Sequence, residues 1–175
     1  MLRRANAYYD HEEWRSAFQL YMRLVDTDDG DHWLMARVSS CYYEQRDYQR
    51  AVEWARRAVA ERGSCPLAQW HLANALDGVG CSEDAADAFR ALIDRGWRRI
   101  AEGRCGEGEA WAKALVNDCR LRLAQIAASQ GGHRDAVRWG RLHLRLRNSQ
   151  RLDSIYDVTM CIDLINRSVV LIAAE

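Results

Sequence analysis

The stretch DYQRAVEWARRAVAE, residues 47–61, has the pattern of a helix, yet it carries alanine where a helix of a bundle would carry leucine. Ala51, Ala55 and Ala58 follow one another at four- and three-residue spacing, which places them on one face of that helix. A face of small residues lets a second helix backbone approach closely, while larger neighbours fill the gaps. Because alanine is also a good helix former, this interpretation needs support from the rest of the chain.

The support comes from a constant interval. Ala17, Ala51 and Ala85 are 34 residues apart, and Ala136 follows after 51 residues, which is one period plus 17. A column of small residues keeps the same spacing, at Ala5, Ser39, Ala73 and Ala124. So does a column four residues after the alanines, at Tyr21, Ala55, Phe89 and Gly140. Helix propensity alone does not require such an interval, so we interpret the chain as a series of repeats.

The pattern over residues 5–147 resembles the tetratricopeptide repeat (TPR), a helix–turn–helix unit of 34 residues. The resemblance implies an all-α fold, an α-α superhelix of about four helix pairs in which each pair buries a face on the next. The expected pairs lie near residues 1–30, 33–64, 67–102 and 107–147. The family's proline after the second helix is absent from the first copy, and the fourth copy has Gly140 and His143 where larger apolar residues or alanine are usual.

The 17 additional residues lie between the third and fourth copies, in RGWRRIAEGRCGEGEAWAKALVNDC, residues 95–119. We expect the second helix of the third copy to run to about Glu102 and the next helix to begin near Glu107. The two would form an extended hairpin with its tip at residues 103–108, and the alternative is a loose loop. The segment is also similar to a stretch of bacterial TPR proteins with the pattern G-E-G followed by W-A-x-x-L-x-N-D-C-R, a similarity that implies no defined activity.

The tail, residues 148–175, departs from the repeat. Its apolar residues alternate at three- and four-residue spacing, as in an amphipathic helix: Ile155, Val158, Ile162, Ile165, Val169 and Ile172. A solenoid needs its last apolar face covered, so we predict a capping helix after the array at 1–147. Apolar surface beyond that need would join two copies of the chain, and the run SVVLIAA could instead form a strand or remain irregular.

Composition limits the function classes. The chain has 25 basic and 25 acidic residues and a net charge of zero, which argues against a general nucleic-acid binder. The N-terminus lacks the apolar core of a secretion signal, and the longest apolar run, near residues 169–174, is too short to span a bilayer. We therefore expect no membrane association and a soluble, cytoplasmic protein. Its six cysteines form no C-x-x-C pair and are expected to be reduced.

In the TPR family the first helices of the pairs line a concave groove, and the resemblance transfers this role to two columns of the present sequence. The first column is Arg3, Arg37, His71 and Arg122, and the second is Asn6, Ser40, Asn74 and Gln125. Trp33, Tyr43 and Trp70 lie beside them. Arginine can bind carboxylates through two hydrogen bonds, so we predict an acidic or carboxylate-bearing peptide as the ligand. The alternative is that the arginines pair with Asp10, Glu44 and Asp77 of the same chain.

Members of the family that bind chaperone tails use lysine and asparagine at several of these places. Here arginine or histidine replaces the lysines, and only Asn6 and Asn74 fit, so a heat-shock-chaperone tail is not the expected ligand.

The basic stretch HRDAVRWGRLHLRLRNSQR, residues 133–151, carries a second candidate surface. Its arginines recur at helical spacing and form one charged face: Arg134, Arg138, Arg141 and Arg145. Such a face is usually solvated, and the alternative is contact with nucleic acid or an acidic protein.

No recognised spacing of cysteine and histidine predicts a metal site or a nucleophile, and GRCGEG lacks the lysine and preceding strand of a phosphate-binding loop. We expect a protein-binding adaptor or scaffold without cofactor or catalysis. The alternative is a scaffold that self-associates through its C-terminal helix.

Overall fold

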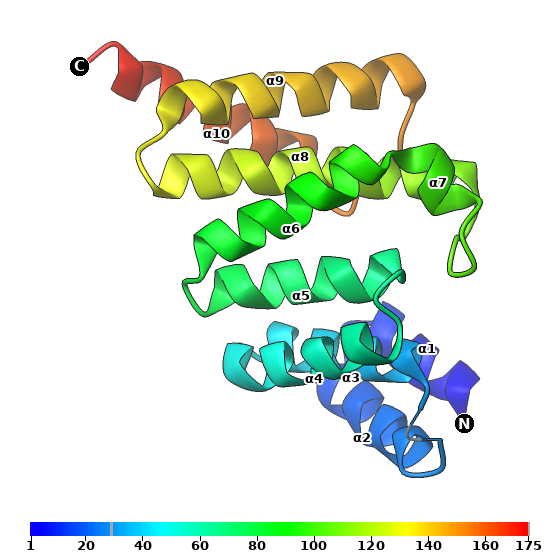
Figure 1. The fold of residues 1–175 in the computed structure, drawn as a ribbon. Coiled ribbons are helices and arrows are strands. Elements are labelled where there is room, and N and C mark those ends of the chain that lie inside the picture. The colour runs from blue at the N-terminus through cyan, green and yellow to red at the C-terminus, as the bar shows by residue number, and fades with distance from the viewer. Residues whose placement is uncertain (29, 175) are drawn as a thin grey trace. The chain divides into compact units, whose positions relative to one another are not determined.

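The structure is a computed structural model that describes residues 1–28 and 30–174. Its helices are α1 (Leu2–Asp10), α2 (Trp14–Val25), α3 (His32–Glu44), α4 (Tyr48–Glu61), α5 (Pro66–Gly78), α6 (Ser82–Arg95), α7 (Trp97–Ala101), α8 (Glu109–Ser129), α9 (His133–Gln150) and α10 (Val158–Ile172) (Figure 1). No strand occurs among the described residues, which confirms the all-α class. None of the helices in the described part of the chain is long and apolar enough to cross a membrane.

The chain divides into two compact units, Met1–Ala88 and Phe89–Glu175, with the division inside α6. In the first unit, α1 packs on α2, α2 on α3, and α3 and α4 on each other and on α5. In the second unit, α7 packs on α8, and α8, α9 and α10 pack against one another. The segment after residue 147 thus belongs to the same compact unit as α8 and α9.

The alanine column and the column of small residues are among the most deeply buried positions. None of their eight members is more than 1% exposed: Ala5, Ala17, Ser39, Ala51, Ala73, Ala85, Ala124 and Ala136. At one of these positions the hydroxyl of Ser39 on α3 donates a hydrogen bond of 2.8 Å to the carbonyl of Ala51 on α4. The recurrent small residues are therefore buried positions in the helix packing, as the sequence predicts.

The turns inside the helix pairs share one backbone geometry. Each contains a residue with positive φ: Glu12 at 61°, Arg46 at 62°, Gly80 at 86° and Gly131 at 77°. The N–H that follows donates to the carbonyl five residues earlier, as in a Schellman motif. These bonds run from Glu13 to Tyr8, Asp47 to Tyr42, Cys81 to Leu76 and Gly132 to Ala127, at 2.8–2.9 Å. The left-handed position repeats at the intervals of the alanine column, 34, 34 and 51 residues, but only the last two copies place glycine there.

The connection between the third and fourth copies differs from the prediction. Gly96 adopts φ 76° and ends α6 at Arg95, so the expected continuous helix to Glu102 is wrong. The short helix α7 follows, and α8 begins at Glu109 rather than near Glu107. Beyond α7 the chain turns back so closely that a Cβ at Gly106 would collide with the carbonyl oxygens of residues 100 and 101. The connection therefore consists of the short helix α7 and a tight turn in which the chain folds back onto the end of that helix.

The fourth copy is fully helical despite its two unusual residues. His143 is 0% exposed, and its Nδ1 lies 2.9 Å from the carbonyl oxygen of Asn117 on α8. The Asn117 side chain in return donates to the carbonyl of His143 at 3.1 Å. Gly140 lies against α10, where a Cβ would be 2.9 Å from Cγ1 of Ile165. The polar pair of Asn117 and His143 thus joins α8 to α9, and the absence of a side chain at Gly140 allows α10 to pack closely against α9.

α10 covers α8 and α9 with a different face from the one that its sequence pattern predicts. Cys161 and Ile165 are buried, whereas Ile162 and Val169 are 42% and 41% exposed. Ile155 precedes the helix and is 75% exposed. The prediction is wrong for these three exposed residues, because the gap at Gly140 receives the side of α10 that carries Cys161 and Ile165. The alternative of a strand at residues 168–174 does not hold, since the helix continues to Ile172.

A buried carboxylate holds the connection between α9 and α10. Asp118 on α8 accepts hydrogen bonds from the Ser154 hydroxyl at 2.6 Å and from the Ile155 N–H at 3.3 Å. Burial raises the pKa of Asp118 to about 6, and these hydrogen bonds act in the opposite direction. Arg147 adds a 2.7 Å bond to the carbonyl of Tyr156, so this connection is held at both sides.

Reciprocal changes at two turns test the left-handed position. Gly80→Ala should lower the free energy of unfolding by about 1 kcal/mol, because alanine is strained at this φ. No atom lies within 4 Å of the added Cβ, so the effect isolates the backbone. Arg46→Gly should raise stability by up to about 1 kcal/mol. Urea denaturation followed by circular dichroism measures both, and shifts of the same sign would contradict the assignment.

Gly140→Ala tests the contact between α9 and α10. Alanine favours the helix by about 1 kcal/mol, but its methyl group would overpack Ile165 at a cost of about 1–3 kcal/mol. We expect a net loss of about 1 kcal/mol in the free energy of unfolding. In an Ile165→Ala background the side chain that would clash with the added methyl group is absent, and Gly140→Ala should become stabilising. Denaturation of the two single variants and the double variant checks this reversal, and a loss of equal size in both backgrounds would refute the close contact.

Candidate functional site

The candidate site in the first unit centres on Arg37 of α3. The Cζ of its guanidinium lies 4.7 Å from the ring centroid of Tyr9 on α1 and 4.8 Å from that of Trp33 on α3. Both distances are within the range of cation–π attraction. The buried Nε of Arg37 has no hydrogen-bond partner among the described residues. We refer to Arg37, Tyr9, Trp33 and Ser40 as the Arg37 cluster.

Hydrogen bonds and ring contacts fix the cluster in place. The hydroxyls of Tyr9 and Ser40 lie 2.6 Å apart and join α1 to α3. Tyr21 on α2 donates a 2.8 Å hydrogen bond to Oδ1 of Asn6, and its ring lies edge-on to Tyr9 and Trp33. Burial raises the pKa of Tyr9, so its hydroxyl stays protonated near neutral pH. Two of the predicted polar contacts, Asn6 and Ser40, therefore support the aromatic rings around Arg37.

His71 of α5 lies within the electrostatic reach of this cluster. Burial and the positive charge of Arg37 lower the pKa of His71 to about 3, so its ring is neutral at physiological pH. Its Nε2 is buried with no hydrogen-bond partner in the described part of the chain. A neutral imidazole beside a guanidinium adds a hydrogen-bonding group without a second positive charge.

The remaining predicted residues of the first unit differ in exposure. Arg3 is exposed on α1, and Tyr43 is half-buried, with its ring 5.2 Å from that of Tyr48. Trp70 is 6% exposed and offers little of the flat surface that the sequence led us to expect. Asn74 is 7% exposed, and its amide nitrogen donates to the carbonyl of Trp70 on the same helix at 2.8 Å.

The last two predicted residues belong to the second unit and bond to each other. Arg122 donates a 2.7 Å hydrogen bond to the side-chain carbonyl of Gln125, and its Cζ lies 5.8 Å from the Phe89 ring. The amide nitrogen of Gln125 reaches the sulfur of Met160 on α10 at 3.7 Å. Arg122 is only 9% exposed. In this unit the two side chains connect α8 to its neighbours.

The alternative in which the arginines pair with acids of the same chain does not apply to Arg37. No carboxylate among the described residues forms an ion pair with it, and both of its close neighbours are aromatic rings. Asp77 instead accepts a 2.9 Å hydrogen bond from Ser82. Burial and the nearby Glu12 raise the pKa of Glu44. Arg37 thus has no acidic partner among the described residues.

Tyr9 belongs to this cluster, although the sequence pattern did not predict it. Tyr9 occupies the same repeat position as Tyr43, 34 residues earlier, so the period itself was the signal that could have identified it. Its contact with Arg37 depends on how α1 packs beside α3, which no local pattern shows.

Comparison with known proteins identifies the fold. No protein-family model and no curated protein matches the chain. Two crystal structures of the TPR-like protein MamA are similar to it, with TM-scores of 0.56 and 0.57. The first is 14% identical and covers 97% of this chain and 84% of the MamA chain. The second is 12% identical and covers 97% and 95%. At such identities the similarity shows the fold alone, and it confirms the TPR-like architecture.

Proposed function

We propose that this protein is a non-enzymatic interaction module, whose first unit binds a carboxylate-bearing segment of a partner protein along α1, α3 and α5. The observation that carries the proposal is the Arg37 guanidinium, held by two aromatic rings and without an acidic partner among the described residues. The fold supports it, because TPR-like helix pairs suit the presentation of a surface to another protein.

The Arg37 cluster is suited to a carboxylate for physical reasons. A guanidinium offers a planar set of donors that matches the two oxygens of a carboxylate. The rings of Tyr9 and Trp33 restrain the side chain before binding, so less rotamer entropy is lost when a ligand forms its hydrogen bonds. Arg3 and Tyr43 extend the proposed surface along α1 and α3, and His71 extends it along α5, where the nearly covered Asn74 contributes little.

Arg37→Lys tests the role of the guanidinium. The change keeps the charge and most of the packing but removes the bidentate geometry, so we expect partner binding to weaken about tenfold or more. Partners are first captured from a lysate of the source organism with the wild-type protein and identified by mass spectrometry. Their affinity for both proteins is then measured by calorimetry.

Arg57→Lys is the matched control. Arg57 also stacks on a tryptophan, with Cζ 4.1 Å from the Trp54 ring, but it lies on α4 rather than on the proposed surface. This change should leave the affinity unaltered. Equal affinities of the Arg37 and Arg57 variants would reject the Arg37 cluster as the binding site.

A second candidate function is self-association through the outer side of α10. Its specific support is a set of exposed apolar side chains: Ile155, Ile162, Val169, Val170 and Leu171, at 41–75% exposure. Four of these residues lie on α10 and Ile155 precedes it, and exposed apolar residues concentrated in one segment often mark a protein interface. A second copy of the chain would cover the part of the tail that the contact with α8 and α9 leaves open.

Analytical ultracentrifugation over a range of concentrations tests this candidate. The wild-type protein should form dimers that dissociate on dilution, and Val170→Glu should shift it to monomers, because Val170 is 67% exposed and the change leaves the internal packing intact. Gln49→Glu, an exposed site on α4, adds the same charge and should have no effect. A monomeric wild-type protein at high concentration would exclude this candidate and leave the first one in place.

A further inference from the structure

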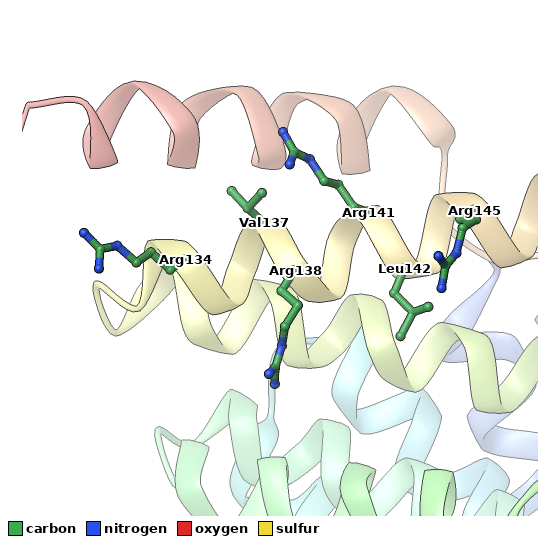
Figure 2. A pocket seen from close by; sticks show the side chains of 6 residues that line it. All are labelled: Arg134, Val137, Arg138, Arg141, Leu142 and Arg145. Atoms are coloured by element: carbon green, nitrogen blue, oxygen red, sulfur yellow. The ribbon is translucent and has the colours of Figure 1, made fainter.

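The outer side of α9 carries an open groove that the proposed function does not use. Its volume is about 530 Å³, and α9 alone supplies its lining residues: Arg134, Val137, Arg138, Arg141, Leu142 and Arg145 (Figure 2). We call it the α9 groove. Its lining residues all belong to the second unit, and none of them belongs to the Arg37 cluster.

Positive charge dominates the α9 groove. All four arginines are exposed, and Asp135 is the only acid paired with any of them in the described part of the chain, at 3.6 Å from Nε of Arg138. Arg134, Arg141 and Arg145 have neither an ion pair nor a hydrogen bond with any described residue. Arg138 in addition lies over the Trp139 ring, with its Cζ at 5.2 Å. Three of the four guanidinium groups are thus available to an external anion.

The arginines follow one another at intervals of four, three and four residues. At the helical rise per residue, this series spans about 16 Å along the axis. Like charges at these spacings repel one another and weaken an isolated helix, so folding of this chain alone gains nothing from the series. An external carboxylate beside each arginine would turn the repulsion into attraction.

Apolar side chains lie between the arginines. Val137 is 8% exposed and Leu142 is half-buried, and both line the groove. Figure 2 shows Val137 and Arg141 directed toward α10, and Arg138 and Leu142 directed to the opposite side of α9. Each of these two sides of α9 thus carries one apolar side chain and one guanidinium group.

We propose that the α9 groove binds an acidic amphipathic helix of a partner protein. Carboxylates on one face of that helix would meet the arginines, and its apolar residues would contact mainly Leu142, because Val137 is largely buried in the core and only its edge lines the groove. Nucleic acid fits the groove less well, because a phosphate backbone gains nothing from apolar contacts and the chain as a whole carries no net charge. This binding surface is additional to the one proposed for the first unit.

Calorimetry with designed probes tests the proposal. The first probe is a synthetic helical peptide with glutamate at positions i, i+4, i+7 and i+11 and leucine at i+3 and i+8, the spacing of the groove residues. The second has the same composition in scrambled order. The third is a single-stranded DNA oligomer, and the fourth is a DNA duplex. We expect the full-length protein to bind the first peptide at least tenfold more tightly than the other three, with an affinity that falls as salt is raised.

Variants locate the binding site. The double variant Arg141→Glu/Arg145→Glu should bind the first peptide at least tenfold more weakly, because both side chains are exposed and carry charge into the groove. The double variant Arg15→Glu/Arg56→Glu changes the net charge equally at exposed sites in the first unit and should bind as the wild type does. Circular dichroism confirms that both variants are folded.

With the wild-type protein, any of three results would overturn the proposal: no binding of the first peptide, equal binding of the scrambled peptide, or tighter binding of either DNA. Arg37→Lys should not alter peptide binding at α9, so a failure here leaves the function proposed for the first unit unaffected. Loss of peptide binding in the Arg37 variant would assign the peptide to the Arg37 cluster and refute the α9 groove.

Discussion

The close approach of helices at small residues is the constraint on which the rest of the structure depends. Alanine or serine occupies the buried column positions, and glycine at position 140 admits the last helix. A larger side chain at such a position would separate the backbones and remove contacts along the whole helix pair, because protein interiors are already packed near the density of crystals. The polar pair of Asn117 and His143 fills one such contact with hydrogen bonds. The small residues set the distance between the helices, and larger buried side chains such as Tyr21, Phe89 and Leu92 fill the space around them.

This packing leaves arginine side chains on the outward faces of the helices, and the two binding surfaces that we propose differ in how these arginines are held. In the first unit Tyr9 and Trp33 hold Arg37 in one orientation, which favours selective binding of a carboxylate. In the second unit the arginines of the α9 groove are exposed and mostly unpaired, an arrangement that favours attraction and on-rate over a single fixed geometry. A chain with no net charge can therefore still present two cationic surfaces.

The candidate site could be predicted only in part. Repeat spacing placed Arg37 and Ser40 on the same helix, and the structure finds them near each other beside α1. Repeat spacing did not reveal Tyr9, whose contact with Arg37 forms only when α1 packs beside α3. Nor did it show that Trp70 and Asn74 are nearly covered, because exposure depends on the neighbours of α5 and not on residue type. Spacing reports which residues share a column, whereas their contacts require the packed helices.

The sequence by itself determined the all-α class, the helix pairs and their buried columns. These features follow from periodicities within single helices and from a repeat interval that is visible in the sequence. Tertiary structure decided which side of α10 turned inward and which rings enclosed Arg37. The physical reason is that the rotation of a helix about its own axis is set by the surface it meets. For α10 that surface has its gap at Gly140, and the apolar stripe of the tail could not locate it.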